Sequence, residues 1–526
     1  MSCLFNSYDP YFKQPFGAVR AGQTVHLALC IPEELGYVDP HLVLKKEGKF
    51  DVPVYYRMNF DGQTPRQNHF SVEVPLNDPG LYFYYFDLYT DFRRIYRGPD
   101  NCGVVSWQEG EKWQITVYDA GFQTPECIKG KVFYQIFPDR FCEGIENKPM
   151  PFPDRLYQAD KHAEPFWQPN ETGGHLNEDY FGGDLEGIRI KLPYLREMGV
   201  DYLYLNPIFE AHSNNRYNTA DYLNVDPLLG TNEEFREFVA NCHARGQKVI
   251  VDGVFNHVGR DFFAFKDLQA NRENSRYKDW FCDVNFWGNN EYNDGFSYGN
   301  WGGFNLLVKL NQRNPEVQDY HFDTVRFWVE QFDIDGIRLD AADVLDFDFM
   351  RGLRRLANEV KPEFWLMGEV IHGDYSRWAN PEMLHSVTNY ELHKGLWSGH
   401  NDHNYFEIAH TMRRLQGLCH DTRLYTFSDN HDVERLPNKL RNKAHIRHIA
   451  ILVYTLWGIP SIYYGSEFGI EGKKEWGSDW PLRPCLELDK FRDDLTTNPV
   501  TSVYAALGRL KAEYPALSWG EVKELQ

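Results

Sequence analysis

Eight strand-like segments with helix-like stretches between them constrain the fold of this chain more than any other feature of its sequence. The strand candidates are short and mostly apolar, and intervening stretches such as 185–198 and 231–244 have a helical pattern. Repeated β–α units indicate a parallel sheet, and eight of them predict a closed (β/α)₈ TIM barrel of the α/β class. The eight candidates span residues 131–137, 201–207, 247–252, 336–340, 363–369, 385–390, 424–427 and 460–464.

The remaining segments flank or interrupt this barrel. Residues 1–125 contain alternating segments at 24–29, 69–74, 80–86 and 113–118, which predict an N-terminal β-sandwich domain. We assign residues 126–513 to the barrel, with an insertion after strand 3 at 255–311 that is rich in Asn, Gly and aromatic residues. A loop of that length inside a compact domain is usually functional. We expect residues 514–526 to begin a C-terminal β domain that is truncated in this chain.

Composition excludes several classes of partner. A formal net charge of −21 and the lack of a basic run argue against nucleic acid and against an anionic membrane surface. No apolar run reaches about 18 residues, so we expect no membrane span, and the first residues have no secretion signal. Nine cysteines without C-x-x-C spacing favour reduced thiols, a cytoplasmic location and no zinc site.

Polar residues cluster where four of the predicted strands end. In a parallel barrel the active site lies at the C-terminal ends of the strands. Each of these residues by itself also fits a capped strand end, a buried ion pair or a core histidine. Four such groups on parallel strands favour a common site. They are Asp252 with Asn256 and His257 after the third strand, Arg338 and Asp340 in the fourth, Glu369 after the fifth, and His431 with Asp432 after the seventh.

Two of these carboxylates have the environments that glycoside cleavage requires. Arg338 and Asp340 lie two positions apart on a strand and share a face, so we expect the guanidinium to lower the pKa of Asp340 and keep it ionised. Glu369 follows the apolar run 364–367, where burial raises a carboxyl pKa and favours a proton donor. An ionised nucleophile with a neutral acid predicts a retaining glycosidase whose two carboxyls are about 5–5.5 Å apart.

Three further residues complete this hypothesis. Asp432 is a third carboxylate, which we expect to hold sugar hydroxyls and to stabilise positive charge in the transition state. His257 and His431 are candidates for hydrogen bonds to hydroxyls of the same sugar ring.

In their order along the chain, these motifs resemble the four main regions of the alpha-amylase family of glycoside hydrolases, family 13. The matching stretches are Asp252–His257, Gly336–Asp340, Gly368–Glu369 and Asn430–Asp432. The resemblance implies Asp340 as nucleophile, Glu369 as acid/base and Asp432 as transition-state stabiliser. It implies a supporting role for Asp252 and a stacking role under the reacting sugar for Tyr217. With Arg338, Asn256, His257 and His431, these two residues form the predicted substrate-binding set.

Three other segments, 132–141, 180–185 and 308–311, resemble the neopullulanase and cyclomaltodextrinase branch of that family. The resemblance implies a hydrolase that cleaves α-1,4 bonds of maltodextrins, cyclodextrins or pullulan, with α-1,6 cleavage left open. Its partner would be an α-glucan oligosaccharide. In that branch the N-terminal β domain, which is carbohydrate-binding-like, often pairs two subunits, so a homodimer through this domain is also open.

Two departures from the family pattern leave properties open. Residues 341–344 read Ala-Ala-Asp-Val where the branch often has Val-Ala-Asn-Glu, so subsite preference is undecided. Some members bind calcium in the loop after the first strand, but here residues 142–147 beside Asp184 supply only part of the six to eight oxygens that calcium requires. We therefore expect no required cofactor and assign no metal ligand, and a structural calcium ion stays open.

Other functions remain compatible with the same residues. Transfer of the glycosyl group to a sugar would use the same intermediate as hydrolysis, so an α-glucan transglycosylase is an alternative. A non-catalytic glucan-binding barrel is a second alternative, although all three carboxylates are present. A metal-dependent hydrolase would need Asp252, His257, His431 and Asp432 as ligands, and it would leave Arg338 and Glu369 without a role.

Overall fold

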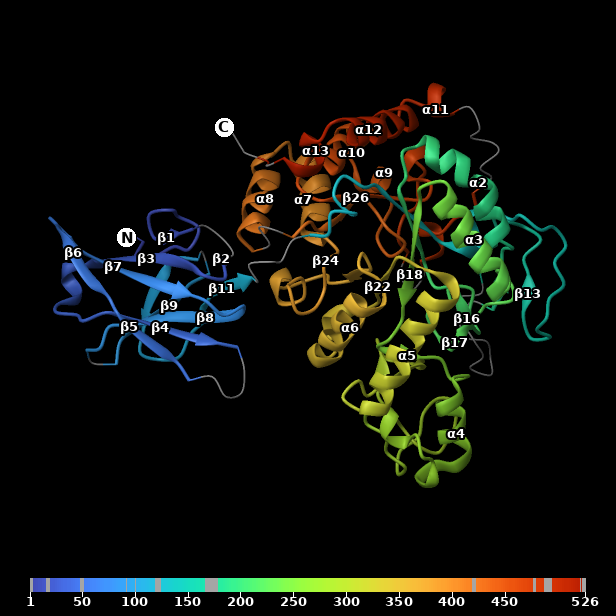
Figure 1. Cartoon of the computed structure of the whole chain (residues 1–526), viewed down its shortest axis with the longest axis horizontal. Coiled ribbons are helices and arrows are strands. Elements are labelled where there is room, and N and C mark those ends of the chain that lie inside the picture. Colours follow the sequence, from blue (N-terminus) through green and yellow to red (C-terminus); the bar gives the residue numbers. More distant parts are fainter. Residues whose placement is uncertain are drawn as a thin grey trace. The chain divides into compact units, whose positions relative to one another are not determined.

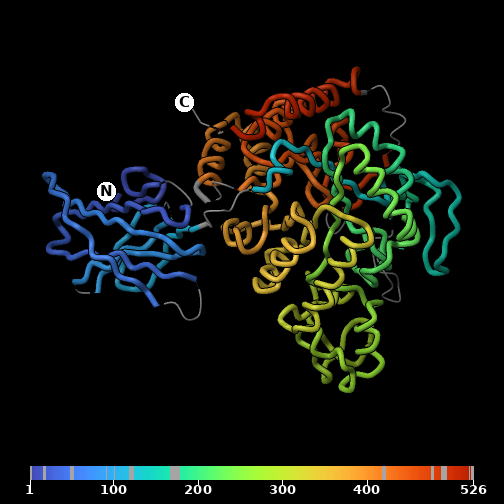
Figure 2. Tube along the Cα trace, in the orientation of Figure 1, coloured from blue at the N-terminus to red at the C-terminus, as the bar shows by residue number. Residues whose placement is uncertain are grey.

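The fold is described from a computed structural model of the chain, whose trace is drawn in Figure 2. The described residues are 3–15, 19–47, 52–90, 92–99, 101–118, 124–165, 178–418, 422–475, 479–486, 494–520 and 522. They form two compact units, each considered by itself. The first consists of Met1–Thr124, Asp374–Pro381 and Ala409–Thr422, and the second of Pro125–Gly373, Glu382–Ile408 and Arg423–Gln526. Two short segments that the sequence assigns to the barrel therefore group with the first unit.

The second unit contains a closed barrel of eight parallel strands (Figure 1). The strand order is β24-β23-β22-β18-β15-β12-β26-β25, and a parallel bridge between Thr388 and Tyr425 joins the two ends. All eight predicted strands and the (β/α)₈ fold are confirmed. The strands are β12 Phe133–Ile136, β15 Tyr202–Leu205, β18 Lys248–Gly253, β22 Gly336–Leu339, β23 Trp365–Gly368, β24 Ser386–Val387, β25 Tyr425–Phe427 and β26 Ile459–Tyr463.

Large aromatic side chains fill the barrel interior. Strand residues two positions apart share a face, so each strand supplies alternate side chains to the inside. Phe133 stacks on Tyr202 with ring centroids 4.6 Å apart. The cluster contains Ile128, Phe133, Tyr202, Tyr204, Ile250, Trp365, Met367, Tyr425, Phe427 and Ile459.

The strand register places the polar residues directly above this core. Asp252 lies two residues beyond Ile250 on β18 and pairs in register with Arg338 of β22. Arg338 in turn pairs with Met367 of β23, whose side chain belongs to the core cluster. Two residues beyond the core side chains Ile250 and Met367, the side chains on the same face of these strands are charged.

Helices separate the strands of the barrel, and polar side chains cap several of their first turns. The Asp184 side chain accepts from the Gly187 backbone at α2, and Thr231 and Glu234 form a reciprocal capping box at α3. The two helices predicted at 185–198 and 231–244 are confirmed. The helices are α1 Pro138–Phe141, α2 Leu185–Glu197, α3 Asn232–Ala244, α5 Pro315–Phe332, α6 Phe347–Val360, α7 Tyr390–Asn401, α8 Phe406–Leu418, α9 Leu436–Lys439, α10 His445–Thr455, α11 Asp494–Thr497 and α12 Thr501–Glu513.

The insertion after the third strand is an ordered lobe that projects from the barrel in Figure 2. It contains α4 Phe263–Asn271 and a three-stranded sheet of β19 His257–Val258, β21 Phe304–Lys309 and β20 Asn300–Trp301. Arg260 forms two hydrogen bonds to Asp294, at 2.7 and 2.8 Å, and lies over the ring of Tyr292. Two further strand pairs are β13 Leu156–Tyr157 with β14 Asp179–Tyr180, and β16 Phe209–Ala211 with β17 Thr219–Val225.

Two facing sheets form the N-terminal β-sandwich that the sequence predicts. One has the order β1-β3-β7-β6 and the other β10-β9-β8-β11-β2, in which β4 also pairs with β8 and β5 pairs with β4. Side chains from both sheets share one apolar core. The strands are β1 Lys13–Gln14, β2 Val19–Arg20, β3 Gln23–Pro32, β4 His41–Lys46, β5 Val54–Arg57, β6 Asn59–Thr64, β7 Gln67–Leu76, β8 Gly80–Asp87, β9 Arg94–Arg97, β10 Gly103–Ser106 and β11 Trp113–Tyr118.

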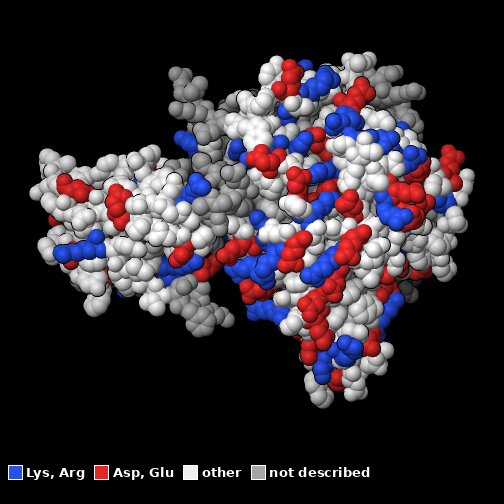
Figure 3. Space-filling model, viewed as in Figure 1, with Lys and Arg blue, Asp and Glu red and all other residues white. Residues whose placement is uncertain are grey.

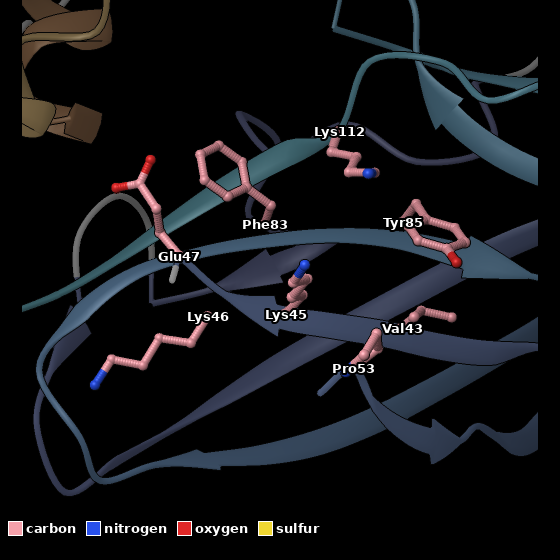
Figure 4. Close-up of a pocket in the computed structure, with 8 residues that line it drawn as sticks. All are labelled: Val43, Lys45, Lys46, Glu47, Pro53, Phe83, Tyr85 and Lys112. Carbon is pink, nitrogen blue, oxygen red and sulfur yellow. The ribbon is translucent and has the colours of Figure 1, made fainter. Parts of the chain in front are cut away.

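A concavity of about 410 Å³ lies on the outer face of this sandwich (Figure 4). Phe83 and Tyr85 of β8 line it, opposite Lys45 and Val43 of the neighbouring β4. The four side chains share a face because both pairs are two residues apart on adjacent strands.

One prediction about the cysteines is wrong. Cys3 and Cys102 form a disulfide, with their Cα atoms 5.7 Å apart, where the sequence suggests that all thiols are reduced. Spacing along the chain gave no hint of it, because 99 positions separate the two residues. Among the described residues, cysteines 30, 127, 142, 242, 282 and 485 take no part in a disulfide.

The strand expected near the C-terminus falls on residues that, apart from Val522, lie outside the described ones, so it stays a prediction, and the segment before it is helical. Ala516–Trp519 form the short helix α13, which follows Pro515 in a helical conformation. Lys511 holds this turn by donating from Nζ to Leu517 O at 2.6 Å and to Tyr454 O at 2.9 Å. Residues 521 and 523–526 lie outside the described residues.

No helix among the described residues is long and apolar enough to cross a bilayer. On the visible face of the barrel unit, acidic and basic side chains are interspersed, without a continuous basic surface (Figure 3).

Candidate active site

Arg338 contacts three carboxylates at the C-terminal ends of three adjacent strands. Its Nη1 donates to Asp252 Oδ1 and to Asp340 Oδ1, each at 2.8 Å, and its Nη2 lies 2.9 Å from Glu369 Oε2. Only 3% of the Arg338 side chain is exposed. Asp340 and Glu369 therefore bind the two terminal nitrogens of one buried guanidinium, which brings the predicted nucleophile and acid together.

The exposed fractions of these carboxylates show which ones can meet a ligand. The side chain of Asp252 is fully buried, whereas 10% of Asp340 and 12% of Glu369 remain exposed. Asp252 thus lies beneath the other two carboxylates, as expected of a supporting residue.

Backbone geometry after the fourth strand orients Glu369. Ala341 follows Asp340 with φ +45°, a left-handed conformation that is uncommon for a residue with a side chain. In this conformation its N–H donates to Glu369 Oε2 at 3.1 Å. The turn that ends the strand of Asp340 therefore also holds the carboxylate of the next strand.

A second hydrogen-bond network holds Tyr217 beside the carboxylates. The Tyr217 hydroxyl donates to Asp252 Oδ2 at 2.9 Å, accepts from Asn206 at 2.9 Å and lies 2.7 Å from His431 Nε2. The Tyr217 and His431 rings are nearly parallel, at 8°, with centroids 5.7 Å apart. This arrangement fixes the partly exposed Tyr217 ring as a platform at the site.

His431 is held as a neutral imidazole. Gln135 donates from Nε2 to His431 Nδ1 at 2.8 Å, which leaves the ring proton on Nε2. Burial lowers the pKa of His431 to about 3. Its Nε2 lies 3.1 Å from Asp432 Oδ2, so an N–H at this position can donate either to Asp432 or to Tyr217.

Asp432 is the most open of the three predicted catalytic carboxylates, with 35% of its side chain exposed. Arg483 donates from Nη2 to Asp432 Oδ1 at 2.9 Å. Removal from water raises the pKa of Asp432, but the positive charges around it, among them the guanidinium of Arg483, outweigh this effect and the net pKa is lowered. Asp432 is therefore ionised at neutral pH.

The structure gives His257 and Asn256 a different role from the predicted contact with sugar. His257 is 1% exposed, its Nε2 lies 3.1 Å from Tyr217 O, and its Nδ1 lies 3.2 Å from Asn256 Nδ2. Both ring nitrogens are engaged by protein, so no N–H of His257 remains for a hydroxyl. Burial lowers its pKa to about 4, which keeps it neutral. His257 instead holds the backbone of the Tyr217 segment.

The predicted direction of the Asp340 pKa is wrong. Removal from water is the largest influence and raises the pKa of Asp340 well above its usual range, and it also raises the pKa of Glu369. Arg338 lowers both, as the sequence suggests, but one guanidinium serves three carboxylates. A proton retained by the Asp340–Glu369 pair relieves this excess negative charge, and the pair titrates as a unit.

The ligand set of a metal-dependent hydrolase does not assemble. Asp252 accepts from Arg338, Tyr204 and Tyr217, while the nitrogens of His257 face Tyr217 and Asn256. Within the described ranges, no group of three or more His, Cys, Asp or Glu side chains is arranged to hold a metal ion.

Sequence reasoning missed several residues of the site. Asn206 directly follows the second strand, so the rule that located the other strand-end residues could have found it. Gln135 lies inside the first strand, and Tyr390 contacts Glu369 Oε1 at 3.4 Å from the first turn of α7. Arg483 lies in an irregular segment far along the chain, where no sequence pattern marks it.

Comparison with known families decides the membership of this chain. The model of the alpha-amylase catalytic domain matches residues 135–509, which include the whole site described above. The chain belongs to the alpha-amylase family. Its relatives assign it to the neopullulanase and cyclomaltodextrinase branch of that family.

Three relatives illustrate the resemblance. The chain is 35% identical to an intracellular maltogenic amylase of Bacillus subtilis over 380 residues, covering 71% of this chain and 60% of that protein. It is 39% identical to neopullulanase 2 of Thermoactinomyces vulgaris over 418 residues, covering 76% and 66%. A solved cyclomaltodextrinase structure matches with a TM-score of 0.69 at 25% identity, covering 98% and 84%. The chain thus spans about 60–66% of the length of these two curated relatives.

In this member of the alpha-amylase family, replacing Glu369 by Gln is expected to raise stability at about pH 8. A group whose folded-state pKa is raised contributes stability at low pH and loses it as the pH rises through that pKa. The advantage of the variant should therefore be smallest near pH 4–5 and grow with pH. Urea unfolding at several pH values measures it.

Glu237→Gln, at an exposed position of α3, is the matched control and should show no such pH dependence. A Glu369→Gln variant that is less stable than wild type at about pH 8 would contradict the burial argument.

Proposed function

We propose that this chain is a retaining α-glucan hydrolase that cleaves α-1,4 bonds of maltodextrins, cyclodextrins or pullulan. The observation that carries the proposal is the shared contact of Asp340 and Glu369 with the guanidinium of Arg338. The names of the relatives, which include maltogenic amylase, neopullulanase and cyclomaltodextrinase, support the substrate class. Cleavage of α-1,6 bonds stays open.

In the first step Asp340 attacks the anomeric carbon and forms a covalent glycosyl-enzyme. Glu369 gives its proton to the leaving glycosidic oxygen, so that no unstable alkoxide is expelled. The raised pKa that burial gives Glu369 supports this role. Binding of sugar next to Asp340 leaves the shared proton on Glu369, because Arg338 Nη1 and the developing positive charge both favour an ionised Asp340.

In the second step Glu369 removes a proton from water, which attacks the anomeric carbon and releases Asp340. Both steps pass through a transition state with oxocarbenium character. Asp432 is ionised and partly exposed, so it can accept hydrogen bonds from sugar hydroxyls that strengthen in that state. The Tyr217 ring supports the apolar face of the same sugar.

The proposed reaction also has consequences for cofactors, for the acceptor of the glycosyl group and for the pairing of subunits. The reaction requires no cofactor, because side chains supply the nucleophile, the acid and the charge stabilisation. Transfer to a sugar would divert the glycosyl-enzyme formed by the same residues, and the names of the relatives favour water as the acceptor. Pairing of two copies through the N-terminal sandwich stays a prediction.

We propose a cytoplasmic location, for which the name of the relative from Bacillus subtilis gives support. In that compartment the Cys3–Cys102 disulfide would be exposed to reducing conditions, in which paired thiols are rare.

Replacing Asp340 by Asn is expected to lower kcat/KM for maltotriose or cyclodextrin by at least about 10³-fold, because the nucleophile is lost. Release of reducing sugar measures it. Asp319→Asn, at an exposed position of α5, keeps the three catalytic carboxylates and is the matched control. Hydrolysis that persists undiminished in Asp340→Asn would rule out the assigned nucleophile.

We also propose that the N-terminal concavity binds a glucan chain, as a carbohydrate-binding-like domain would. Phe83 and Tyr85 offer two aromatic side chains for stacking, and Lys45 and Lys112, which also line the concavity, supply hydrogen-bond donors (Figure 4).

The double variant Phe83→Ala/Tyr85→Ala is expected to lose at least half of the retardation that soluble amylopectin causes in native electrophoresis, because both stacking surfaces are gone. Phe60→Ala, an exposed aromatic residue on the other sheet, should keep it. Equal retardation of all three proteins would contradict binding at this concavity.

A further inference from the structure

The ammonium group of Lys148 is enclosed by three oxygens in the loop that follows the first barrel strand. Its Nζ donates to Gly182 O at 2.8 Å, to Asp184 Oδ2 at 2.7 Å and to Leu228 O at 3.2 Å. An ammonium has three protons, and all three are used. The side chain of Lys148 is 10% exposed and that of Asp184 is 1% exposed.

Asp184 has no free lone pair. Its Oδ1 accepts from the backbone of Gly144 at 3.0 Å and of Gly187 at 2.6 Å. Its Oδ2 accepts from the backbone of Ile145 at 3.0 Å and from Lys148. A carboxylate offers about four acceptor positions, and four donors occupy them here.

A second lysine neutralises Glu143, another acidic residue beside Lys148. Lys161 Nζ lies 3.1 Å from Glu143 Oε2 and donates to Phe181 O at 2.5 Å. Two ammonium groups thus balance the two carboxylates Glu143 and Asp184. The amount of positive charge equals that of one divalent cation.

This is the loop where the family resemblance leaves a structural calcium ion open, and the residues present do not fit one. Calcium requires six to eight oxygens at 2.3–2.6 Å, whereas the carboxylate oxygens of Asp184 are already filled by N–H donors. The remaining polar side chains of the loop, Glu146 and Asn147, are exposed.

The backbone also leaves little space for an ion with its ligand shell. A Cβ atom added to Gly144 would lie 2.3 Å from Gly187 N, and one added to Gly187 would lie 2.1 Å from Cys142 O. These chain segments are therefore in direct contact. A charged ammonium in the same place would further repel a divalent cation.

We propose that Lys148 is a tethered cation that does the structural work of a calcium ion, so that the fold of this chain needs no calcium. Its ammonium joins three segments that are far apart in sequence: the loop after β12, the start of α2 and the turn before α3. Being covalently attached, it cannot be removed by a chelator.

The test compares Lys148→Met with Lys473→Met in the full chain. Methionine keeps the length of the stem but removes the charge, and it leaves one acceptor position of Asp184 and the carbonyls of Gly182 and Leu228 without this donor. We expect the Tm of Lys148→Met to fall by about 5 °C. The control replaces an exposed lysine and should change Tm by less than about 1 °C.

Calcium dependence is measured on the same proteins without substrate, so the result does not depend on the proposed function. The Tm of the wild type should be equal in EGTA and in millimolar CaCl₂, and calorimetric titration with CaCl₂ should detect no binding. Lys148→Asp, which exchanges the cation for oxygen ligands, should gain stability on addition of CaCl₂.

Three outcomes would overturn the proposal. They are a wild-type Tm that falls in EGTA and recovers with CaCl₂, calcium binding by the wild type in the titration, and a Lys148→Met variant as stable as the control. The titration decides the question on the wild type alone if the variants do not fold.

Discussion

The contact of one buried guanidinium with three carboxylates is the interaction on which the site depends. Arg338 binds Asp252, Asp340 and Glu369 from a position that is 3% exposed. Three negative charges near one positive charge leave an excess that burial makes costly, so the cluster favours retaining a proton. In the proposed reaction, the nucleophile and the proton donor both depend on this electrostatic imbalance. The strand register supplies the geometry, because Asp252 pairs with Arg338 directly above the aromatic core.

The other residues of the site act mainly by fixing those that we propose to contact the sugar. Gln135 and Asn206 hold His431 and Tyr217, and His257 holds the backbone of Tyr217. Burial keeps both histidines neutral, with pKa values of about 3 and 4. In the proposed reaction, this network would remove the need to order Tyr217 on substrate binding, which would lower the entropic cost of catalysis.

The sequence predicted the barrel because each strand is a short apolar run, and it predicted the carboxylates because each follows such a run. The sequence pattern did not predict contacts between segments that are far apart along the chain. Arg483 reaches Asp432 from an irregular segment, Cys3 pairs with Cys102 across 99 positions, and Lys148 meets three separate segments. The pKa of Asp340 was misjudged because the sequence displays its neighbour Arg338 but not the loss of water or the other two carboxylates.

The central claim is that Asp340 forms a covalent bond to the sugar while Glu369 exchanges protons with the leaving group and with water. The anomeric form of the first product tests it most directly, because two successive displacements retain configuration and a single one inverts it. Proton NMR of maltotriose or cyclodextrin hydrolysis, recorded before mutarotation, should show the α-anomer of the new reducing end first. Initial release of the β-anomer would contradict the account, because water would then attack the sugar directly and Asp340 would not be a nucleophile.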